Sequence, residues 1–394
     1  MILLALILFA CSPKVVTTPA RSVKEPSVVV KEEKSTKKFT EANISLLIPF
    51  KLNQLNLQTA TKTQLERADM AIDFYQGVLL GLDSAAASGL NFRVNVLDTR
   101  DETGQLLNLL KKESLKTSNL IIGPVFPEGV KSITNYAIAN DLMIVSPLSA
   151  SKPSDFNNPN LISIVNNIDQ HGEKIADYIA ENYQSNNSIV VLINPRKTAD
   201  EQFAAPIRNR FKLKHGKFIV QEFTSAYAFE TRMIKDKKYA VVICSADIPF
   251  VAPSIEKLFK LKNLKTGAYE ISLFGHPNWT KQTYNVDQLQ DLNTIVSTSY
   301  RVDYKSASVV NFIKSYRGKY SFEPSEYSFK GFDIGYYFAR LLAKHGPRYV
   351  DFLTKEKYKG LHNSFDFEYQ PKFGYVNKDL MLVQYKNLNL NLVN

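Results

Sequence analysis

Cysteine is scarce in this chain of 394 residues, which contains only Cys11 and Cys244. Two cysteines cannot form the disulfide framework that holds small secreted domains together, so that class of protein is excluded. Cys244 lies in the β-rich apolar run YAVVICSAD and is predicted to pack as a small buried side chain. Glycine is also sparse, at 16 residues, whereas the apolar fraction of 44% is typical of a packed globular protein. The length allows two or three domains.

The sequence also lacks the short motifs that carry catalytic chemistry. It has no G-x-S-x-G elbow, no phosphate-binding P-loop and no H-E-x-x-H motif, and its five histidines lie too far apart for ordinary metal-ligand spacing. Asp98 and Asp333 could be read as paired carboxylates, but Asp98 ends a predicted strand and Asp333 lies in a predicted helix, where it would anchor a hinge. We therefore expect no enzymatic activity, no metal and no cofactor.

Acidic residues are outnumbered, because 49 Lys and Arg stand against 38 Asp and Glu and give a net charge of +11. Such a surface favours anionic partners such as lipid headgroups, cell-wall polymers or nucleic acid. The basic residues are spread along the chain, however, and the sequence has no zinc-finger spacing, helix-turn-helix signature or RNA-binding aromatic motif. We therefore expect no binding to nucleic acid.

The first eleven residues, MILLALILFAC, are apolar from Ile2 to Ala10 and end at Cys11. Nine apolar residues are too few for a membrane span, which needs about 20, but they suit the apolar core of a signal peptide. The end of this run resembles a bacterial lipobox, whose cysteine receives diacylglycerol. The resemblance implies that residues 1–10 are removed and that Cys11 carries a lipid anchor in a membrane. The alternative is an ordinary secretory signal with an incidental cysteine, and no Lys or Arg precedes the apolar run.

The residue after the cysteine is Ser12, which by resemblance to bacterial lipoproteins favours the outer membrane. No acidic run follows, so export to the cell surface is less expected than a location in the cell envelope facing the periplasm. From Ser12 to about Phe39 the chain consists mainly of Lys, Glu, Ser, Thr, Val and Pro without periodicity, and we interpret it as a tether.

Beyond the tether, apolar strand-like runs alternate with segments of helical periodicity, first from ISLLIPF to LMIVSPL and again from SIVVLI to EISLFGHP. Parallel strands need such helical crossovers, so the fold class is α/β, with two doubly wound Rossmann-like lobes joined by three crossovers. The crossings are expected near residues 164–167, 297–303 and 346–367, and a hairpin is expected around Gly374. The predicted organisation is a signal peptide over 1–10, a tether over 11–42, the first part of lobe 1 over 43–165, the first part of lobe 2 over 166–298, the second part of lobe 1 over 299–350 and the C-terminal part of lobe 2 over 351–394.

Several of these segments resemble a known family. The runs IIGP, IVSPLSAS, ISIVNNIDQHGEKIADYI and PSEYSFKGFDIGYYFARLLAKHG are similar to type I periplasmic binding proteins, which include branched-chain amino acid receptors of ABC transporters. GHPNW, YRGKYSFEPSEYSFKGFD and the terminal FDF…G also resemble envelope lipoproteins and lysin-motif proteins of Bacteroidetes, although no lysin motif is visible here. GPVFPEGVKSI resembles a turn in lipoprotein activators of penicillin-binding proteins.

The resemblance implies a ligand site between the lobes, with one clamp at the Gly-Pro turn and another in the SP-x-x-(S/T) loop. The receptors carry a hydroxyl residue after the Gly-Pro turn, where this chain has Phe126-Pro127, and proline has no N–H to donate. Their Tyr-Gly pair in the second lobe is replaced here by Pro195-Arg196. Candidate cleft residues are therefore Phe126, Ser149, Ser151, Arg196, Trp279, Tyr300 and Arg301, with Tyr304 as a further aromatic; the aromatic residues could instead belong to the core of lobe 2, and the arginines to the surface.

Two classes of function fit these observations. The first is a periplasm-facing, membrane-anchored lipoprotein that binds a small molecule between its lobes without enzymatic activity. The second is an envelope scaffold or activator lipoprotein that uses the same fold to bind a protein partner of the cell-wall or outer-membrane machinery. The commonest use of the fold favours the first, and the altered Gly-Pro loop favours the second. Because Phe126 and Pro127 are expected to narrow the cleft, we predict that free α-amino acids do not bind.

Overall fold

The computed structural model describes residues 39–56, 58–264 and 269–393. The predicted signal peptide, Cys11 and the tether up to residue 38 lie outside these ranges. Within them, every helix is too short or too polar to cross a lipid bilayer. The described chain has two seven-stranded sheets, each flanked by helices, and we refer to these halves as lobe 1 and lobe 2.

The sheet of lobe 1 has the strand order β13-β14-β5-β4-β3-β1-β2. Its strands are parallel except for β13, which runs antiparallel to β14. The strands are β1 (Glu41–Ile48), β2 (Asn91–Asp98), β3 (Leu120–Ile122), β4 (Ile144–Ser146), β5 (Leu161–Ser163), β13 (Phe367–Gln370) and β14 (Gly374–Asn377). The helices of this lobe are α1 (Lys62–Ala86), α2 (Thr103–Leu109), α3 (Glu113–Lys116), α4 (Pro127–Ala139), α10 (Ala307–Tyr320) and α11 (Glu326–His345).

The sheet of lobe 2 has the order β16-β15-β10-β9-β8-β6-β7, with β15 antiparallel to both of its neighbours. Its strands are β6 (Ser188–Ile193), β7 (Ile219–Phe223), β8 (Lys238–Ile243), β9 (Glu270–Gly275), β10 (Ile295–Thr298), β15 (Met381–Lys386) and β16 (Asn389–Leu392). Its helices are α5 (Ile168–Asn182), α6 (Thr198–Lys214), α7 (Ala226–Glu230), α8 (Ile248–Lys262) and α9 (Val286–Asp291). The short 3₁₀ helices η1 (Leu52–Gln54), η2 (Pro153–Asp155), η3 (Pro277–Lys281) and η4 (Gly346–Phe352) and the two-stranded ladder of β11 (Tyr358–Lys359) and β12 (Ser364–Phe365) complete the fold.

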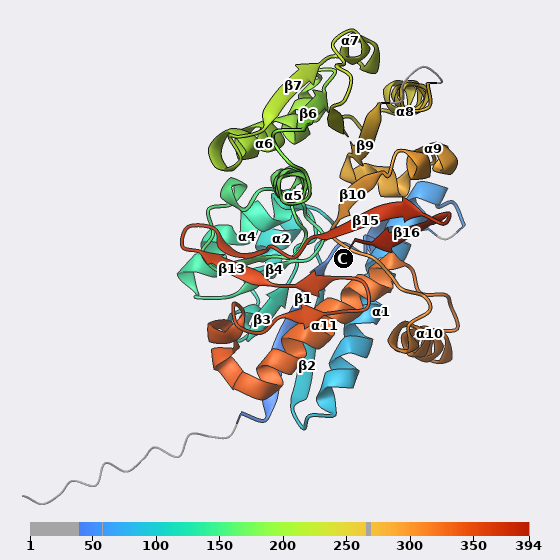
Figure 1. Ribbon diagram of the computed structural model, residues 1–394. Helices are drawn as coiled ribbons and strands as arrows, with labels where there is room; N and C mark the ends of the chain where they lie inside the picture. Colours follow the sequence, from blue (N-terminus) through green and yellow to red (C-terminus); the bar gives the residue numbers. More distant parts are fainter. Residues whose placement is uncertain (1–38, 57, 265–268, 394) are drawn as a thin grey trace, which may run out of the picture. The chain divides into compact units, whose positions relative to one another are not determined.

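The central strands are buried along their whole length because helices cover both faces of each sheet. All six residues of β6 are buried, and Cys244, at the end of β8, is buried as predicted. In lobe 1, α1 and α11 run side by side although they are far apart in the sequence (Figure 1). A Cβ atom at Gly77 or Gly331 would collide with the backbone of the facing helix, so glycine permits this close approach.

The chain crosses between the sheets three times, but the third crossing differs from the prediction. The first two lie at residues 164–167, after β5, and beyond Thr298, where β10 ends. The third lies at residues 378–380, between β14 and β15, and not within 346–367. The assignment of all of 351–394 to lobe 2 was therefore wrong, because β14 pairs in parallel with β5 through Tyr375↔Ile162 and so extends the sheet of lobe 1.

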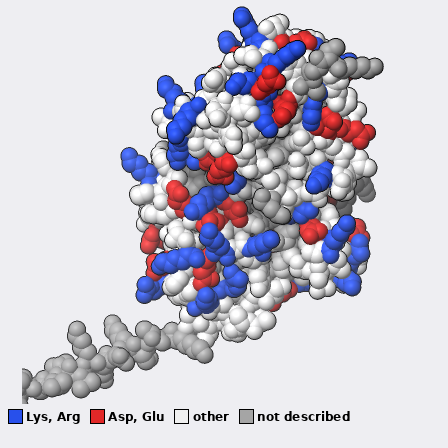
Figure 2. Space-filling view, in the orientation of Figure 1, with Lys and Arg blue, Asp and Glu red and all other residues white. Residues whose placement is uncertain are grey.

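The predicted hairpin around Gly374 is confirmed, since β13 and β14 pair across it and Gly374 adopts a φ of +83°. A second hairpin joins β15 to β16 through Asn387 and Leu388, which both have positive φ. On the face shown in Figure 2, Lys and Arg are interspersed with Asp and Glu and do not form one continuous basic patch.

Candidate functional site

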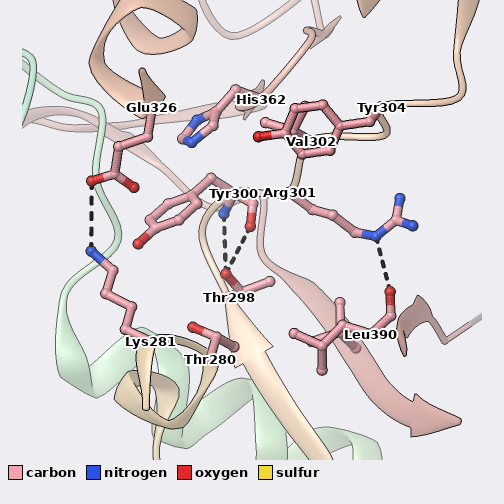
Figure 3. Close-up of a pocket in the computed structure, with 11 residues that line it drawn as sticks. Thr280, Lys281, Thr298, Tyr300, Arg301, Val302, Tyr304, Glu326, His362 and Leu390 are labelled. Atoms are coloured by element: carbon pink, nitrogen blue, oxygen red, sulfur yellow. Dashed lines mark hydrogen bonds and ion pairs between the residues drawn. The ribbon is translucent and has the colours of Figure 1, made fainter. Parts of the chain in front are cut away.

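Two adjoining cavities lie on either side of Tyr300. This residue follows the end of β10, at the start of the second crossing between the sheets. We call the first, of about 440 Å³, the cleft cavity, because its wall comes from both lobes: Leu148 and Ala150 follow β4, whereas Gln202 lies in α6. We call the second, of about 460 Å³, the hinge cavity; it is shown in Figure 3. Four residues line both cavities, namely Thr280, Lys281, Thr298 and Tyr300.

Tyr300 is held in place by Thr298, at the end of β10, and by lobe 1. The hydroxyl of Thr298 donates to the carbonyl of Tyr300 over 2.9 Å. On the other side, the ring of His362 stacks on the ring of Tyr300, with centroids 4.5 Å apart and planes inclined by 10° (Figure 3). The backbone N–H of Arg301 donates to the carbonyl of His362 over 2.9 Å, which aligns the two segments.

The segment that carries His362 is held by a buried carboxylate. Asp333, on α11, accepts hydrogen bonds from the backbone N–H groups of Leu361, His362 and Asn363, each over 2.8 Å. The hydroxyl of Tyr358 donates to the same carboxylate over 3.1 Å. Asp333 therefore anchors residues 358–363 against α11, and this segment in turn contacts the second crossing, in agreement with its expected role at a hinge.

Two lysines approach the ring of Tyr300. The Nζ atom of Lys330 lies 4.6 Å from the ring centroid and that of Lys281 lies 5.3 Å from it. Glu326 is their carboxylate partner, with Oε1 at 3.5 Å from Lys330 and 3.8 Å from Lys281. It is the only carboxylate among the described residues that line the two cavities. Two ammonium groups thus share one carboxylate beside an aromatic face.

Lys330 is the more deeply placed of the two, with its side chain only 10% exposed. Burial lowers the pKa of Lys330, and Glu326 opposes this shift, while the positive charge of Lys281 adds to it. The single negative charge of Glu326 cannot balance the positive charges of both lysines. An anion in the cleft cavity would supply the missing negative charge.

The histidines at this site do not contribute positive charge at neutral pH. His171 places Nδ1 at 2.9 Å from the Ser297 hydroxyl and Nε2 at 3.2 Å from the Ser299 hydroxyl, and it lines the cleft cavity. Burial lowers the pKa of His171 to about 3. Burial also lowers the pKa of His362 to about 4. Both rings are therefore neutral, and the lysines carry the positive potential.

The structure brings three of the sequence-predicted residues together, since Tyr300, Arg301 and Tyr304 all line the hinge cavity. The Arg301 side chain donates from Nε to the carbonyl of Leu390 over 3.3 Å, and Tyr304, 66% exposed, lies beside it (Figure 3). Ser149 and Ser151 lie in the loop after β4, where the Ser149 hydroxyl donates to the Ser151 hydroxyl over 2.9 Å. It is their neighbours Leu148 and Ala150 that line the cleft cavity.

Three other candidates require correction. Trp279 is fully buried and donates from Nε1 to the carbonyl of Ser245 over 2.9 Å, so it is a core residue of lobe 2. Phe126 precedes α4 and lines a separate depression of about 30 Å³, and it does not narrow either cavity as expected. Arg196 is exposed in the loop after β6 and lines neither cavity.

Sequence reasoning missed Lys281, Glu326 and Lys330. One pattern pointed to Lys330, because its neighbours in SFKGFD lie on the buried side of a helix, where a lysine is unusual. Lys281 could not have been found in this way, since it ends the short helix η3 and its position depends on the approach of the two lobes. Among the described residues, no cluster of three or more potential ligands could hold a metal ion.

Comparison with solved structures places this architecture among the type I periplasmic binding proteins, so the expected fold is confirmed. A protein from Rhodospirillum rubrum assigned as a branched-chain amino acid ABC transporter is 14% identical, with a TM-score of 0.62, and the match covers 90% of this chain and 99% of that one. A solute-binding protein of an ABC transporter from Rhodopseudomonas palustris, in complex with 3,4-dihydroxybenzoic acid, is 13% identical, with a TM-score of 0.51 and coverage of 90% and 95%.

Full-length LpoA from Haemophilus influenzae is 14% identical, with a TM-score of 0.56, and the match covers 91% of this chain but only 60% of LpoA. Identities at this level show a shared fold and nothing more. No known protein-family model matches the sequence, and no curated protein matches it significantly.

Proposed function

We propose that this chain is a non-enzymatic solute-binding lipoprotein of the cell envelope, of the kind seen in Bacteroidetes, which faces the periplasm from the outer membrane. Its ligand is a small organic anion with a flat or apolar body, held between the lobes beside Tyr300. Cys11 would carry the lipid anchor, with residues 12–38 as the tether.

The observation that carries this proposal is the excess of positive charge beside the half-buried ring of Tyr300. Lys281 and Lys330 flank Tyr300, and Glu326 is the only carboxylate among the described lining residues. A carboxylate, sulfonate or phosphate between these lysines would complete the charge balance, and a flat group could lie against Tyr300. The bound 3,4-dihydroxybenzoic acid of the Rhodopseudomonas palustris protein is one molecule of this chemical type, on the same fold.

The same charges disfavour a free α-amino acid. Its ammonium group would have to lie near Lys281 and Lys330, and Glu326 is already shared by both lysines. An ammonium that enters a partly buried site without a carboxylate partner weakens binding.

A thermal-shift screen tests the proposal. Benzoate, 4-hydroxybenzoate, 4-methylpentanoate and succinate are each compared with the corresponding neutral amide. An anion at 100 times its Kd should stabilise the protein by about 2.7 kcal/mol, whereas its amide should have little effect. Lys330→Met should abolish the shift measured against its own unliganded Tm, and Lys314→Met, which removes an exposed lysine of α10, should retain it. The proposal fails if no anion stabilises the wild type, or if Lys330→Met responds as the wild type does.

A second function is favoured by the sequence, in which Phe126 and Pro127 stand where the receptors that the chain resembles carry a hydroxyl residue. In this alternative the chain is an envelope scaffold or activator that binds a protein partner of the cell-wall or outer-membrane machinery, and LpoA has a related fold. Crosslinking in intact cells, followed by identification of the captured envelope protein, distinguishes the two. Capture that depends on the exposed Tyr304, combined with a failed ligand screen, would favour the scaffold.

A further inference from the structure

A groove of about 520 Å³ lies on lobe 1, apart from the cleft and hinge cavities. We call it the Arg340 groove. Helix α11 forms its floor, α1 and α10 form one wall, and residues 357–361 form the other. It shares no lining residue with the two cavities beside Tyr300, so its occupancy can be tested separately from the proposed function.

Aromatic rings line the floor of the groove. Phe332, Tyr336 and Arg340 are spaced four residues apart on α11 and therefore share one face of the helix. The rings of Phe332 and Tyr336 are stacked, with centroids 5.8 Å apart and planes inclined by 4°. The ring centroid of Tyr358, on the facing segment, lies 6.1 Å from that of Tyr336. This surface suits a flat apolar body.

Arg340 lies at one end of this aromatic floor without a counterion. Its guanidinium carbon is 5.7 Å from the centroid of Tyr358, and its Nε atom is buried without a hydrogen-bond partner in the described structure. None of its nitrogens lies within ion-pair distance of a carboxylate of the described residues. A lysine in this position could lose its proton, but an arginine side chain remains charged in a protein. A half-buried guanidinium without a carboxylate partner among the described residues therefore favours an anionic ligand.

The remaining charges at the groove have the same sign. Lys357 and Lys359 stand at its edge; Lys357 is paired with Asp366 over 2.8 Å, and Lys359 has no such pair within the described ranges. None of the described residues lining the groove is acidic. The wall opposite Tyr358 supplies small polar groups, namely Ser84, Ser308, Asn311 and Ser315.

We propose that the Arg340 groove is a second binding site, which takes a planar organic anion. The carboxylate, sulfonate or phosphate of this ligand is bound by the Arg340 guanidinium, and its ring lies on Phe332, Tyr336 and Tyr358. A guanidinium presents a fork of N–H donors that matches such oxyanions, which explains the use of arginine here.

The test measures binding of 4-fluorobenzoate by ¹⁹F NMR titration. It is carried out in the full chain with Lys330→Met, which weakens the site proposed beside Tyr300. The result for the groove therefore does not depend on whether the proposed function is correct. In this background, adding Arg340→Met should raise the Kd by about tenfold or more, because a charge-assisted pair is lost. Lys344→Met is the matched control, since it removes an exposed positive charge one turn along α11 and outside the groove; it should change the Kd by less than about twofold.

A second variant guards against misfolding of the arginine mutant. Ser315→Trp, at an exposed position of α10, should fill the groove and also abolish binding. Neutral 4-fluorobenzamide should bind at least about tenfold more weakly than the anion. The proposal is overturned if 4-fluorobenzoate does not bind in the millimolar range, if Arg340→Met and Lys344→Met have equal effects, or if Ser315→Trp leaves the Kd unchanged.

Discussion

His362 stacks on Tyr300 with ring centroids 4.5 Å apart, and this contact joins a loop of lobe 1 to the strand that leaves lobe 2. His362 does not hold this position by itself, because its backbone N–H donates to Asp333 on α11. Tyr300 also lies between the two cavities, and the ammonium groups of Lys281 and Lys330 approach its ring. The geometry of the candidate ligand site therefore depends on a buried carboxylate that does not line it.

Replacement of that carboxylate should destabilise the protein strongly. Asp333→Ala leaves the N–H groups of Leu361, His362 and Asn363 without their acceptor, and each buried unsatisfied donor costs about 1–3 kcal/mol. We expect a loss of about 3–6 kcal/mol in the free energy of unfolding, measured by urea denaturation. Asp333→Asn keeps one acceptor oxygen and should lose less.

The control for this prediction is Asp303→Ala. The side chain of Asp303 accepts a single hydrogen bond, from the backbone N–H of Lys305 over 3.2 Å, at an exposed position. Its removal should cost less than about 1 kcal/mol. Equal losses in the free energy of unfolding for Asp333→Ala and Asp303→Ala would show that the buried hydrogen bonds of Asp333 add no more stability than one exposed bond.

His171 should make stability depend on pH. Burial holds the pKa of His171 at about 3 in the folded protein, against 6.5 for the unperturbed group. Between these values the unfolded chain binds a proton that the folded chain does not. The free energy of unfolding should therefore fall as pH decreases below 6.5, by about 1.4 kcal/mol per pH unit from this residue.

The measurement is urea denaturation of wild type and His171→Gln at pH 7.5, 6.5, 5.5 and 4.5. The variant should be less stable at pH 7.5, because the hydroxyls of Ser297 and Ser299 lose a ring nitrogen partner. Its stability should also fall less steeply towards pH 4.5. Parallel curves for the two proteins would mean that folding does not lower the pKa of His171.

Local patterns in the sequence predicted the two lobes well, but they could not assign every strand to its sheet. Runs such as SIVVLI are buried on both faces, and this requirement is visible in the sequence itself. The hairpin around Gly374 was equally visible, yet nothing in its alternation indicates that β14 pairs with β5, more than 200 residues earlier. Such long-range pairing depends on the completed sheet edge and not on the residues of the hairpin.

The candidate site was predictable only in part, for a similar reason. Tyr300 and Arg301 follow a buried strand, and the ends of parallel strands are where ligands bind in α/β folds. Trp279 was misassigned because an aromatic residue in a loop sequence can fold back onto its own core, as its bond to Ser245 shows. Lys330 is remote from the strand ends in the sequence, and its position beside Tyr300 depends on the folded arrangement of α11 and the second crossing.

The turn between β15 and β16 offers a stabilising substitution. Leu388 has a φ of +57° and is 71% exposed, and this backbone region costs a non-glycine residue about 1–2 kcal/mol. Leu388→Gly should raise the free energy of unfolding by about 0.5–1 kcal/mol after the greater entropy of glycine in the unfolded chain is subtracted. Leu392→Gly, at the end of β16 in the same hairpin, is the control and should lower it. A loss of stability in both variants would contradict the strain assigned to Leu388.

The central claim is that the site beside Tyr300 selects an anion and rejects an α-amino acid. Isothermal titration of leucine and of 4-methylpentanoate, which differ only by the ammonium group, tests it most directly. The account predicts that 4-methylpentanoate binds at least about tenfold more tightly than leucine, because Lys281 and Lys330 repel the ammonium, and that Lys330→Met removes this difference. Binding of leucine in the low micromolar range, or tighter than 4-methylpentanoate, would contradict the claim.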